Sequence, residues 1–271
     1  MGRRHDTVSF LSDYGMEDEF VGVVRSVIRS LASHVTVVDI THGVAAHDVR
    51  AGSLALVRAV QYLAPGVVLA VVDPGVGTDR RAVAVEVGPE GEAVFVGPDN
   101  GLLAGAVAMT GGATRAVELT ETDYHLPAPA ATFAGRDVFA PVAGHLCNGA
   151  DLADLGPPID PITLRPGLLP LCRQEEGKLM SEVLWVDHFG NAQLNVDPED
   201  IAGMGDRISL RWGLDQVRTG RLAGAYGELG AGEVGLVIDS YGMVSVALDR
   251  RSAAEELRLR PGDAVTLEAA S

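Results

Sequence analysis

Aspartate and other polar residues follow several of the buried, strand-like runs in the first half of the chain. Four of these runs end in polar segments: Ser12-Asp13-Tyr14-Gly15, Asp39-Ile40-Thr41-His42, Asp73 to Arg81, and Gly97 to Gly101. A single aspartate at such a place would be unremarkable, because aspartate begins turns readily. In open α/β sheets, however, ligands bind beyond the carboxyl ends of the strands. Four polar strand ends therefore favour a ligand site over turn chemistry alone.

The hydrophobic pattern predicts the elements that position these side chains. Strands are predicted at 7–12, 35–40, 67–73, 82–87 and 93–97. Apolar residues recur at helical spacing from Phe20 to Leu31, and further helices are predicted to begin at Asp48, a good N-cap, and after Gly135. Strands that alternate with helices are typical of an α/β domain whose mostly parallel sheet is covered on both faces.

The second half of the chain has a different residue pattern, with more prolines first and short glycine-separated strands after them. It is proline-rich and irregular from Asp151 to about Arg173, which indicates a linker. We place the linker proper at 166–174, between an α/β domain at 1–165 and a second domain at 175–271. Short, glycine-punctuated strands are predicted in the second domain at 180–187, 207–210, 233–238, 243–248 and 264–267. This spacing indicates a small all-β barrel or sandwich.

The composition disfavours several classes of partner. The 271 residues are 47% hydrophobic and carry a formal net charge of −16, which repels phosphate backbones, so we expect no nucleic-acid partner. No apolar run reaches the ~20 residues that cross a bilayer, so we expect no membrane partner. Cys147 and Cys172 lack metal-ligand spacing and fit a reducing compartment. With no signal peptide recognisable, we expect a cytoplasmic location.

Seven short motifs occur in order along nearly the whole chain, from residue 7 to about residue 257. They are Ser12-Asp13-Tyr14-Gly15 with Gly22, Asp39-Ile40-Thr41-His42, Asp73-Pro74-Gly75-Val76-Gly77-Thr78 with Arg80, Gly97-Pro98-Asp99-Asn100-Gly101-Leu102-Leu103, Thr132-Phe133-Ala134-Gly135-Arg136-Asp137, Asp187-His188-Phe189-Gly190-Asn191 and Asp239-Ser240-Tyr241-Gly242. Together they resemble the S-adenosyl-L-methionine hydroxide adenosyltransferase family, long called DUF62. That family also contains the fluorinating and chlorinating enzymes, which attack the same carbon of the substrate with halide.

The resemblance implies an overall organisation that composition does not show. It implies an α/β N-terminal domain with a mostly parallel sheet and a C-terminal all-β barrel. It also implies a homotrimer whose active sites lie at subunit interfaces, between the N-terminal domain of one chain and the C-terminal domain of its neighbour. S-adenosyl-L-methionine is the substrate in this family, and neither a metal nor another cofactor is implied.

Carried over motif by motif, the resemblance assigns substrate contacts in both domains. The assigned residues are Asp13, Phe133, Asp187, Phe189, Asn191, Ser240 and Tyr241. Asp13 would accept hydrogen bonds from the ribose hydroxyls, or else cap the turn that follows it. Asp187 would pair with the α-ammonium and Ser240 with the carboxylate of the substrate. Phe189 and Asn191 would hold the adenine, with a plain hairpin turn as the alternative.

The same resemblance places the chemistry at Asp73 and Arg80. The leaving group is a neutral thioether from a sulfonium, so it needs no acid, and the demand falls on a weakly nucleophilic water. Asp73 can accept a proton from that water or orient it, while Arg80 holds Asp73 and stabilises developing hydroxide. A purely structural ion pair between the two is the alternative, and Arg81 is the neighbouring candidate for the arginine.

One position departs from the hydrolytic members of the family. Ala134 stands where those members usually carry a histidine that completes an Asp–Arg–His set around the water. Alanine can neither donate nor accept a proton. If the histidine takes part in proton transfer, its loss costs roughly 10²–10⁴-fold in rate. His42 and His47 are conceivable substitutes, although each is also consistent with a structural role near a strand or helix end.

These observations lead to one hypothesis and three rival functions. The hypothesis is an enzyme that hydrolyses S-adenosyl-L-methionine to adenosine and L-methionine by water or hydroxide attack at the 5′ carbon. The first rival is a chlorinase-like halide user. A carboxylate at Asp73 would repel an anionic nucleophile, and the long insertion of the fluorinating enzymes after Arg81 is absent, so both features argue against halide. The second rival is a nucleoside-binding protein with attenuated catalysis, which Ala134 favours, and the third is a metal-dependent hydrolase.

Overall fold

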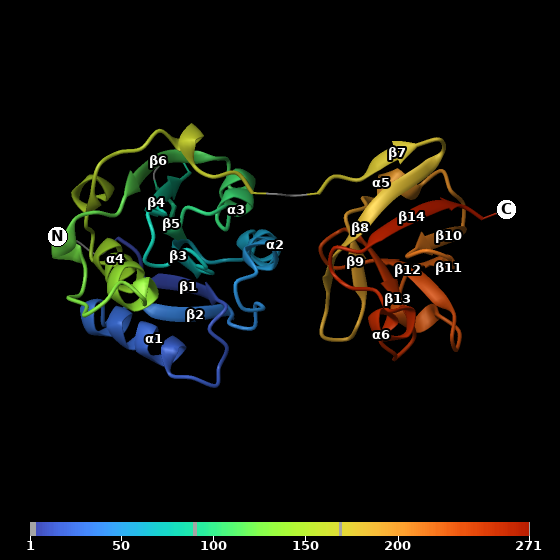
Figure 1. Cartoon of the computed structure of the whole chain (residues 1–271), viewed down its shortest axis with the longest axis horizontal. Coiled ribbons are helices and arrows are strands. Elements are labelled where there is room, and N and C mark those ends of the chain that lie inside the picture. The colour runs from blue at the N-terminus through green and yellow to red at the C-terminus, as the bar shows by residue number, and fades with distance from the viewer. Residues whose placement is uncertain (1–3, 89–90, 168–169, 271) are drawn as a thin grey trace. The chain divides into compact units, whose positions relative to one another are not determined.

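The chain divides into two compact units, Met1–Leu168 and Leu169–Ser271, which are described separately (Figure 1). The computed structural model describes residues 4–88, 91–167 and 170–270. Leu168 and Leu169, in the middle of the predicted linker, lie outside the described residues. The domain boundaries at 165 and 175 stay a prediction.

A six-stranded sheet forms the centre of the first unit. Its strands are β1 (Thr7–Ser12), β2 (Thr36–Thr41), β3 (Gly66–Val71), β4 (Ala82–Val87), β5 (Ala93–Pro98) and β6 (Ala113–Glu118). They lie in the order β2-β1-β3-β5-β4-β6. Strands β2, β1, β3 and β5 are mutually parallel, whereas β4 runs antiparallel to both of its neighbours. The predicted mostly parallel sheet is confirmed, and β4 sends its carboxyl end to the opposite edge.

Helices cover both faces of this sheet, as predicted. They are α1 (Phe20–Leu31), α2 (Val49–Val60), α3 (Ala104–Met109) and α4 (Ala140–Cys147), the last preceded by a π-helical turn at Gly135–Phe139. Helices α1 and α4 share one hydrophobic core with Val8 and Phe10 of β1, while α2 and α3 share the other with Leu11 (Figure 1). Asp48 is the N-cap of α2 and accepts a hydrogen bond from the N–H of Ala51 at 2.8 Å.

The proline-rich stretch after Asp151 is not an open linker along its whole length, which corrects the wider interpretation from sequence. It contains the 3₁₀ turns Leu152–Leu155 and Pro161–Thr163. Between them, the carbonyl of Pro157 accepts from the N–H of Glu118, and the N–H of Ile159 donates to Ala116. These bonds attach the segment to β6. Backbone hydrogen bonds therefore make it part of the first unit, although its prolines suggested otherwise.

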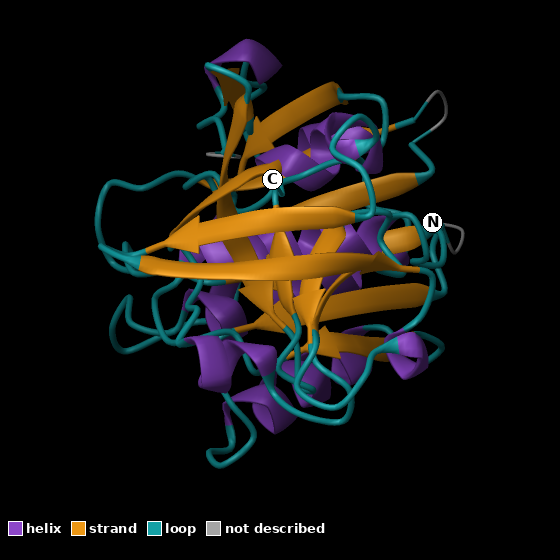
Figure 2. Cartoon of the chain, turned by 90° about the vertical axis from the view of Figure 1, so that its right-hand side faces the viewer, coloured by secondary structure: helices purple, strands orange, loops and turns teal. Residues whose placement is uncertain are grey.

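The second unit is a closed barrel, which confirms the predicted class (strands orange in Figure 2). Its strands are β7 (Arg173–Glu175), β8 (Lys178–Val186), β9 (Ala192–Leu194), β10 (Arg207–Trp212), β11 (Gln216–Ala223), β12 (Val234–Ile238), β13 (Val244–Ala247) and β14 (Ala264–Ala269), with the short helices α5 (Pro198–Ile201) and α6 (Ala253–Leu257). The order β14-β10-β11-β12-β13-β9-β8 closes through the β14–β8 pairing, and β7 pairs antiparallel with the first residues of β8. Closure leaves the seven barrel strands without a free edge.

Within the described part of the chain, no helix is long and apolar enough to cross a membrane.

Candidate active site

Two of the four polar strand ends meet at one cavity in the first unit. Strands β1 and β3 are parallel neighbours, and their carboxyl ends lead to Asp13 and Asp73. Both carboxylates line a cavity of about 260 Å³. The cavity is also lined by Tyr14, His47, Phe133, Ala134 and Gly135. The structure thus brings together the predicted residues of the first unit, except Arg80, which reaches the cavity through Asp73.

The remaining two polar strand ends have structural partners instead. Asp39 is bound by Arg25 from α1, whose Nε lies 3.1 Å from Oδ1. Asp99 is bound by Arg81 at 2.9 and 2.6 Å. It also accepts from the backbone N–H of Arg165 at 2.8 Å. Arg81 is therefore engaged with Asp99, and Arg80 is the arginine that pairs with Asp73.

Asp73 and Arg80 form a two-point ion pair on the cavity wall. Arg80 Nε donates to Asp73 Oδ1 at 3.0 Å, and Arg80 Nη2 donates to the second carboxylate oxygen. Only 6% of the Asp73 side chain and 12% of the Arg80 side chain are exposed. The guanidinium also stacks over the ring of Phe139, 5.5 Å from its centroid. The pair is thus fixed in orientation and largely dry, as an activated carboxylate requires.

The loop between Asp73 and Arg80 shapes this pair. The Thr78 hydroxyl donates to the carbonyl of Gly75 at 2.7 Å, which closes the turn. Gly77 has a φ of +77°, and a Cβ there would lie 2.8 Å from the carbonyl oxygen of Ala131. Burial raises the pKa of Asp73 above its ordinary value, while the charge and hydrogen bond of Arg80 pull that pKa down.

Asp13 is anchored by a distant segment and does not cap its own turn. Its Oδ2 accepts from the backbone N–H of His47 at 2.8 Å. His47 adopts a left-handed φ of +68°, which is uncommon outside glycine and often marks a functional site. The bond to His47 fixes the carboxylate through one oxygen, which leaves Oδ1 for a ligand hydroxyl.

The two histidines considered as substitutes for the missing imidazole lie in different places. His47 lines the cavity. His42 does not line it: its Nδ1 lies 2.7 Å from the Ser12 hydroxyl, and its Nε2 lies 3.1 Å from Asp39. Burial, assisted by the charge of Arg25, lowers the pKa of His42 to about 4, so this imidazole is neutral at pH 7. The geometry assigns His42 a structural role.

In the second unit, Asp187 organises the β8–β9 hairpin turn. Its Oδ1 accepts from the backbone N–H groups of Phe189 and Asn191 at 2.9 and 2.8 Å. Its Oδ2 accepts from the Asn191 amide at 2.8 Å. Asn191 is buried, whereas the Phe189 side chain is 77% exposed. These bonds close a hairpin turn that leaves an exposed aromatic ring beside a carboxylate, and the adenine contacts of Phe189 and Asn191 stay a prediction.

A second turn of the same design lies beside it. Asp239 accepts from the N–H of Tyr241 at 2.9 Å in the β12–β13 turn, and from Gln193 of β9 at 2.7 Å. Gln193 lies only two residues after the β8–β9 turn, so this hydrogen bond links the two turns across the β13–β9 pairing. Ser240 and Tyr241 are exposed there, and the Tyr241 ring lies 6.2 Å from that of Trp185.

Sequence reasoning assigned no role to Asp239, Trp185 or Tyr226, which lie in or near these turns. Burial raises the pKa of the Tyr226 hydroxyl, with the charges of Asp239 and Asp187 adding to the effect. A signal for Asp239 was present, because Asp-x-x-Gly recurs at Asp187 and at Asp239. For the two aromatic residues the sequence carried no such pattern.

Comparison with known families decides the affiliation. The SAM hydroxide adenosyltransferase N-terminal domain profile matches residues 8–156, and the corresponding C-terminal domain profile matches residues 181–266. The chain belongs to this family. The polar cavity lies in the hydroxide adenosyltransferase N-terminal domain, and the paired aspartate turns lie in the C-terminal domain of the same family.

Individual relatives span almost the whole chain. The (R)-S-adenosyl-L-methionine hydrolase of Salinispora tropica is 43% identical and covers 97% of each chain. The fluorinase of Actinopolyspora mzabensis is 29% identical over 95% of each chain. The crystal structure of a conserved protein from Thermotoga maritima superposes with a TM-score of 0.88 at 31% identity, covering 96% of this chain and 99% of that one.

Among the described residues, no three His, Cys, Asp or Glu side chains are grouped in the way a metal site requires.

Proposed function

We propose that this protein hydrolyses S-adenosyl-L-methionine to adenosine and L-methionine by attack of water at the 5′ carbon. The observation that carries the proposal is the buried, two-point Asp73–Arg80 pair on the wall of a cavity that also contains Asp13. The 43% identity to a protein named (R)-S-adenosyl-L-methionine hydrolase supports the same substrate and the same nucleophile.

The reaction asks the protein mainly for orientation and for a proton acceptor. As the water oxygen forms its bond to C5′, the C–S bond breaks and its electron pair stays on sulfur, which leaves as the neutral thioether of methionine. The proton released from the water passes to Asp73. Arg80 holds that carboxylate in one orientation, and orientation of this kind contributes several kcal/mol to catalysis. No group is needed to protonate the leaving sulfur.

The other substrate contacts that we propose use polar atoms with hydrogen-bonding capacity not taken up within the protein. Asp13 Oδ1 is placed to accept from a ribose hydroxyl, and the Phe133 ring forms an apolar wall of the same cavity. In the barrel, Asn191 keeps its carbonyl oxygen for the adenine amine, because its amide N–H is given to Asp187. Asp187 and Ser240 would bind the ammonium and carboxylate of the methionine part.

Phe189 and Tyr241 supply exposed rings beside these polar groups. We assign them to packing against the substrate, in agreement with the family resemblance. Aromatic rings of this kind bury much apolar area at little cost in side-chain entropy, which suits the flat adenine.

We further propose a homotrimer with active sites at the subunit interfaces, formed by the first unit of one chain and the second unit of its neighbour. The proposed substrate contacts are divided between the two units, and a cavity of about 260 Å³ lies below the roughly 300–1,000 Å³ of most ligand sites. A cytoplasmic location and the absence of nucleic-acid, membrane, metal and cofactor partners belong to the same proposal.

Halide chemistry is the rival with a relative to support it, since a fluorinase is 29% identical. Asp73 argues against it, because a buried carboxylate repels an incoming anion. Ala134 supports a different rival, a binding protein with attenuated turnover.

One experiment separates these three. The protein is incubated with S-adenosyl-L-methionine, with and without chloride, and adenosine, methionine and 5′-chloro-5′-deoxyadenosine are followed by chromatography. We expect adenosine and methionine in equal amounts in both cases, and no turnover by Asp73→Asn. Binding without product would overturn the enzymatic proposal, and a chlorinated nucleoside would overturn the choice of water.

A further inference from the structure

Tyr14 presents a hydroxyl to the cavity that the mechanism above does not use. The residue follows Asp13 directly, and its ring is fixed by aromatic contacts. The centroids of Phe10, Phe20 and Phe133 lie 6.4, 5.7 and 5.6 Å from that of Tyr14. These edge-on and tilted contacts are favourable aromatic geometries, so the ring has one well-defined orientation.

The Tyr14 hydroxyl lies against residue 135, next to the alanine that replaces the family histidine. A Cβ built on Gly135 would collide with Tyr14 Oη and lie 3.1 Å from Cζ. Tyr14, Ala134 and Asp73 all line the one cavity. Glycine at 135 therefore leaves room for this phenol, and the phenol comes within the same small space as the proposed base.

This hydroxyl has no hydrogen-bond partner among the residues that the structure describes. Tyr14 is half-buried on the lining of the cavity, so its hydroxyl is available to a water or ligand there, and a phenol can both donate and accept. Burial raises the pKa of Tyr14, and the negative charges of Asp13 and Asp73 raise it further. The phenol therefore stays protonated through the neutral and alkaline range, able both to donate and to accept.

We propose that the Tyr14 hydroxyl orients the attacking water in place of the imidazole missing at position 134. The inference rests on the proposed hydrolysis. One hydrogen of the water is directed to Asp73, which takes the proton as the C–O bond forms. The second hydrogen is held by Tyr14 Oη, which leaves a lone pair of the water directed at C5′. Tyr14 neither gains nor loses a proton in the step.

His47 is a second cavity residue with a suitable ring. Its backbone N–H is committed to Asp13, and its side chain is exposed. The Tyr14 hydroxyl is instead fixed beside Gly135 by a ring held in three aromatic contacts, which favours the phenol over the exposed imidazole.

The test is the variant Tyr14→Phe, which keeps the ring and removes only the hydroxyl. We expect kcat to fall about 10²-fold, because one preorganised polar contact to the reacting group is lost, while KM and adenosine affinity stay unchanged. The matched control is Tyr124→Phe in the same unit, whose ring packs against His145 outside the cavity and whose kinetics should equal wild type.

A rescue variant makes the result specific to water orientation. In Ala134→His, the imidazole should take over the task, so adding Tyr14→Phe to it should cost much less than in the wild-type background. An unchanged kcat in Tyr14→Phe would overturn the inference and leave the proposed function intact. Equal losses of adenosine binding and kcat would show a structural role and would overturn it as well. A wild-type protein that forms no adenosine would overturn both.

Discussion

At the residue scale, opposing electrostatic influences set the behaviour of Asp73. Burial disfavours the carboxylate and raises its pKa, whereas the adjacent Arg80 favours the carboxylate and lowers it. The raised pKa makes Asp73 a better proton acceptor than a solvent-exposed aspartate, and the arginine favours its ionised form. Arg80 therefore has two effects on Asp73: it orients the carboxylate, and it limits how far burial raises the pKa.

This balance predicts the pH dependence of the reaction. The active form is the carboxylate, so activity is present above the pKa of Asp73 and is lost as pH falls through it. Because that pKa is raised in the folded protein, we expect the acid limb of kcat/KM to lie above the ~3.9 of an ordinary aspartate. In Arg80→Gln the limb should move to still higher pH, since the lowering influence is gone. A limb that stays in place, or moves down, would contradict the assignment of Asp73 as the base.

The sequence predicted the members of this pair but not the fate of its neighbours. Asp39 and Asp99 lie in polar strand-end segments of the same kind as that of Asp73. Their partners, Arg25 and Arg81, come from elsewhere in the fold and occupy the carboxylates. Which aspartate stays open to a cavity depends on such long-range pairing, which strand-end position alone does not specify.

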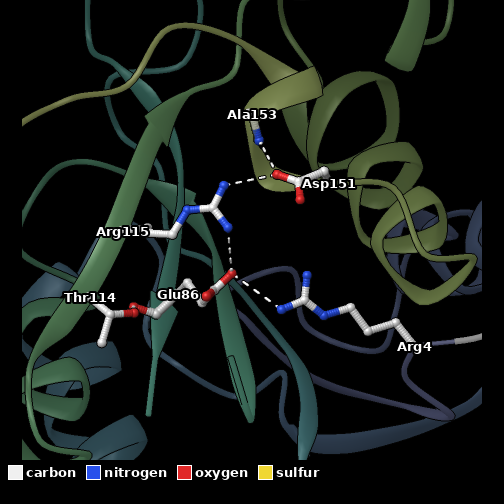
Figure 3. A network of polar contacts seen from close by, with 6 residues as sticks. All are labelled: Arg4, Glu86, Thr114, Arg115, Asp151 and Ala153. Atoms are coloured by element: carbon white, nitrogen blue, oxygen red, sulfur yellow. Dashed lines mark hydrogen bonds and ion pairs between the residues drawn. The ribbon is translucent and has the colours of Figure 1, made fainter. Parts of the chain in front are cut away.

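At the element scale, the proposed catalytic residues and a stabilising ion-pair network lie at opposite edges of the first unit's sheet. Strand β4 runs antiparallel, so Glu86 near its carboxyl end lies at the edge opposite the cavity. There Glu86 lies 3.3 Å from Arg4 and 3.5 Å from Arg115, and Arg115 reaches Asp151 at 2.8 Å (Figure 3). This network joins the start of the chain, two strands and the segment after α4.

We predict that Glu86→Gln lowers the free energy of unfolding and leaves catalysis intact. Only 9% of the Glu86 side chain is exposed, so removing its charge leaves two arginines facing a poorer acceptor. Charge-assisted hydrogen bonds of this type contribute about 1.5–3 kcal/mol, and partial exposure of the arginines places the expected loss near the lower end. Denaturant unfolding measures the loss, and it should shrink in high salt. A changed kcat would contradict the separation of the two edges.

The elements themselves were predicted unevenly, for a physical reason. The predicted ranges of β1, α1 and β4 match the structure, because the apolar residues of α1 recur at helical spacing and β1 and β4 are short buried runs. Strand β9 has three residues, too few for a pattern. Strand β11 is largely exposed along its first half, so no alternation marks it. Barrel closure, through β8 and β14, joins strands about eighty residues apart and leaves no local signal.

At the scale of the whole molecule, the two units are independently packed. The buried hydrophobic clusters of the α/β unit include no residue of the barrel, and the converse also holds for the described residues. Each unit therefore has its own core, and each carries only part of the proposed substrate contacts. Such a division suits an active site assembled between chains, because the folding of either unit does not depend on completing the site.

This division predicts complementation between two inactive variants. Asp73→Asn disables the first unit and Asp187→Ala the second. In a trimer whose sites join the first unit of one chain to the second unit of its neighbour, mixed chains contain some sites built from two intact units. With random assembly of equal amounts, about a quarter of the sites should be intact. Co-refolded or co-expressed mixtures should therefore recover about a quarter of wild-type turnover.

A matched control and the molecular mass in solution decide whether recovered activity comes from sites shared between subunits. Mixing Asp73→Asn with Arg80→Gln, both in the first unit, should recover nothing, because no site then gains an intact first unit. Light scattering should give three times the chain mass of 28.3 kDa. Recovery by the first mixture and not by the second requires a site shared between subunits. A trimer without recovery would place each complete site within one chain, and a monomer would remove the basis for sharing altogether.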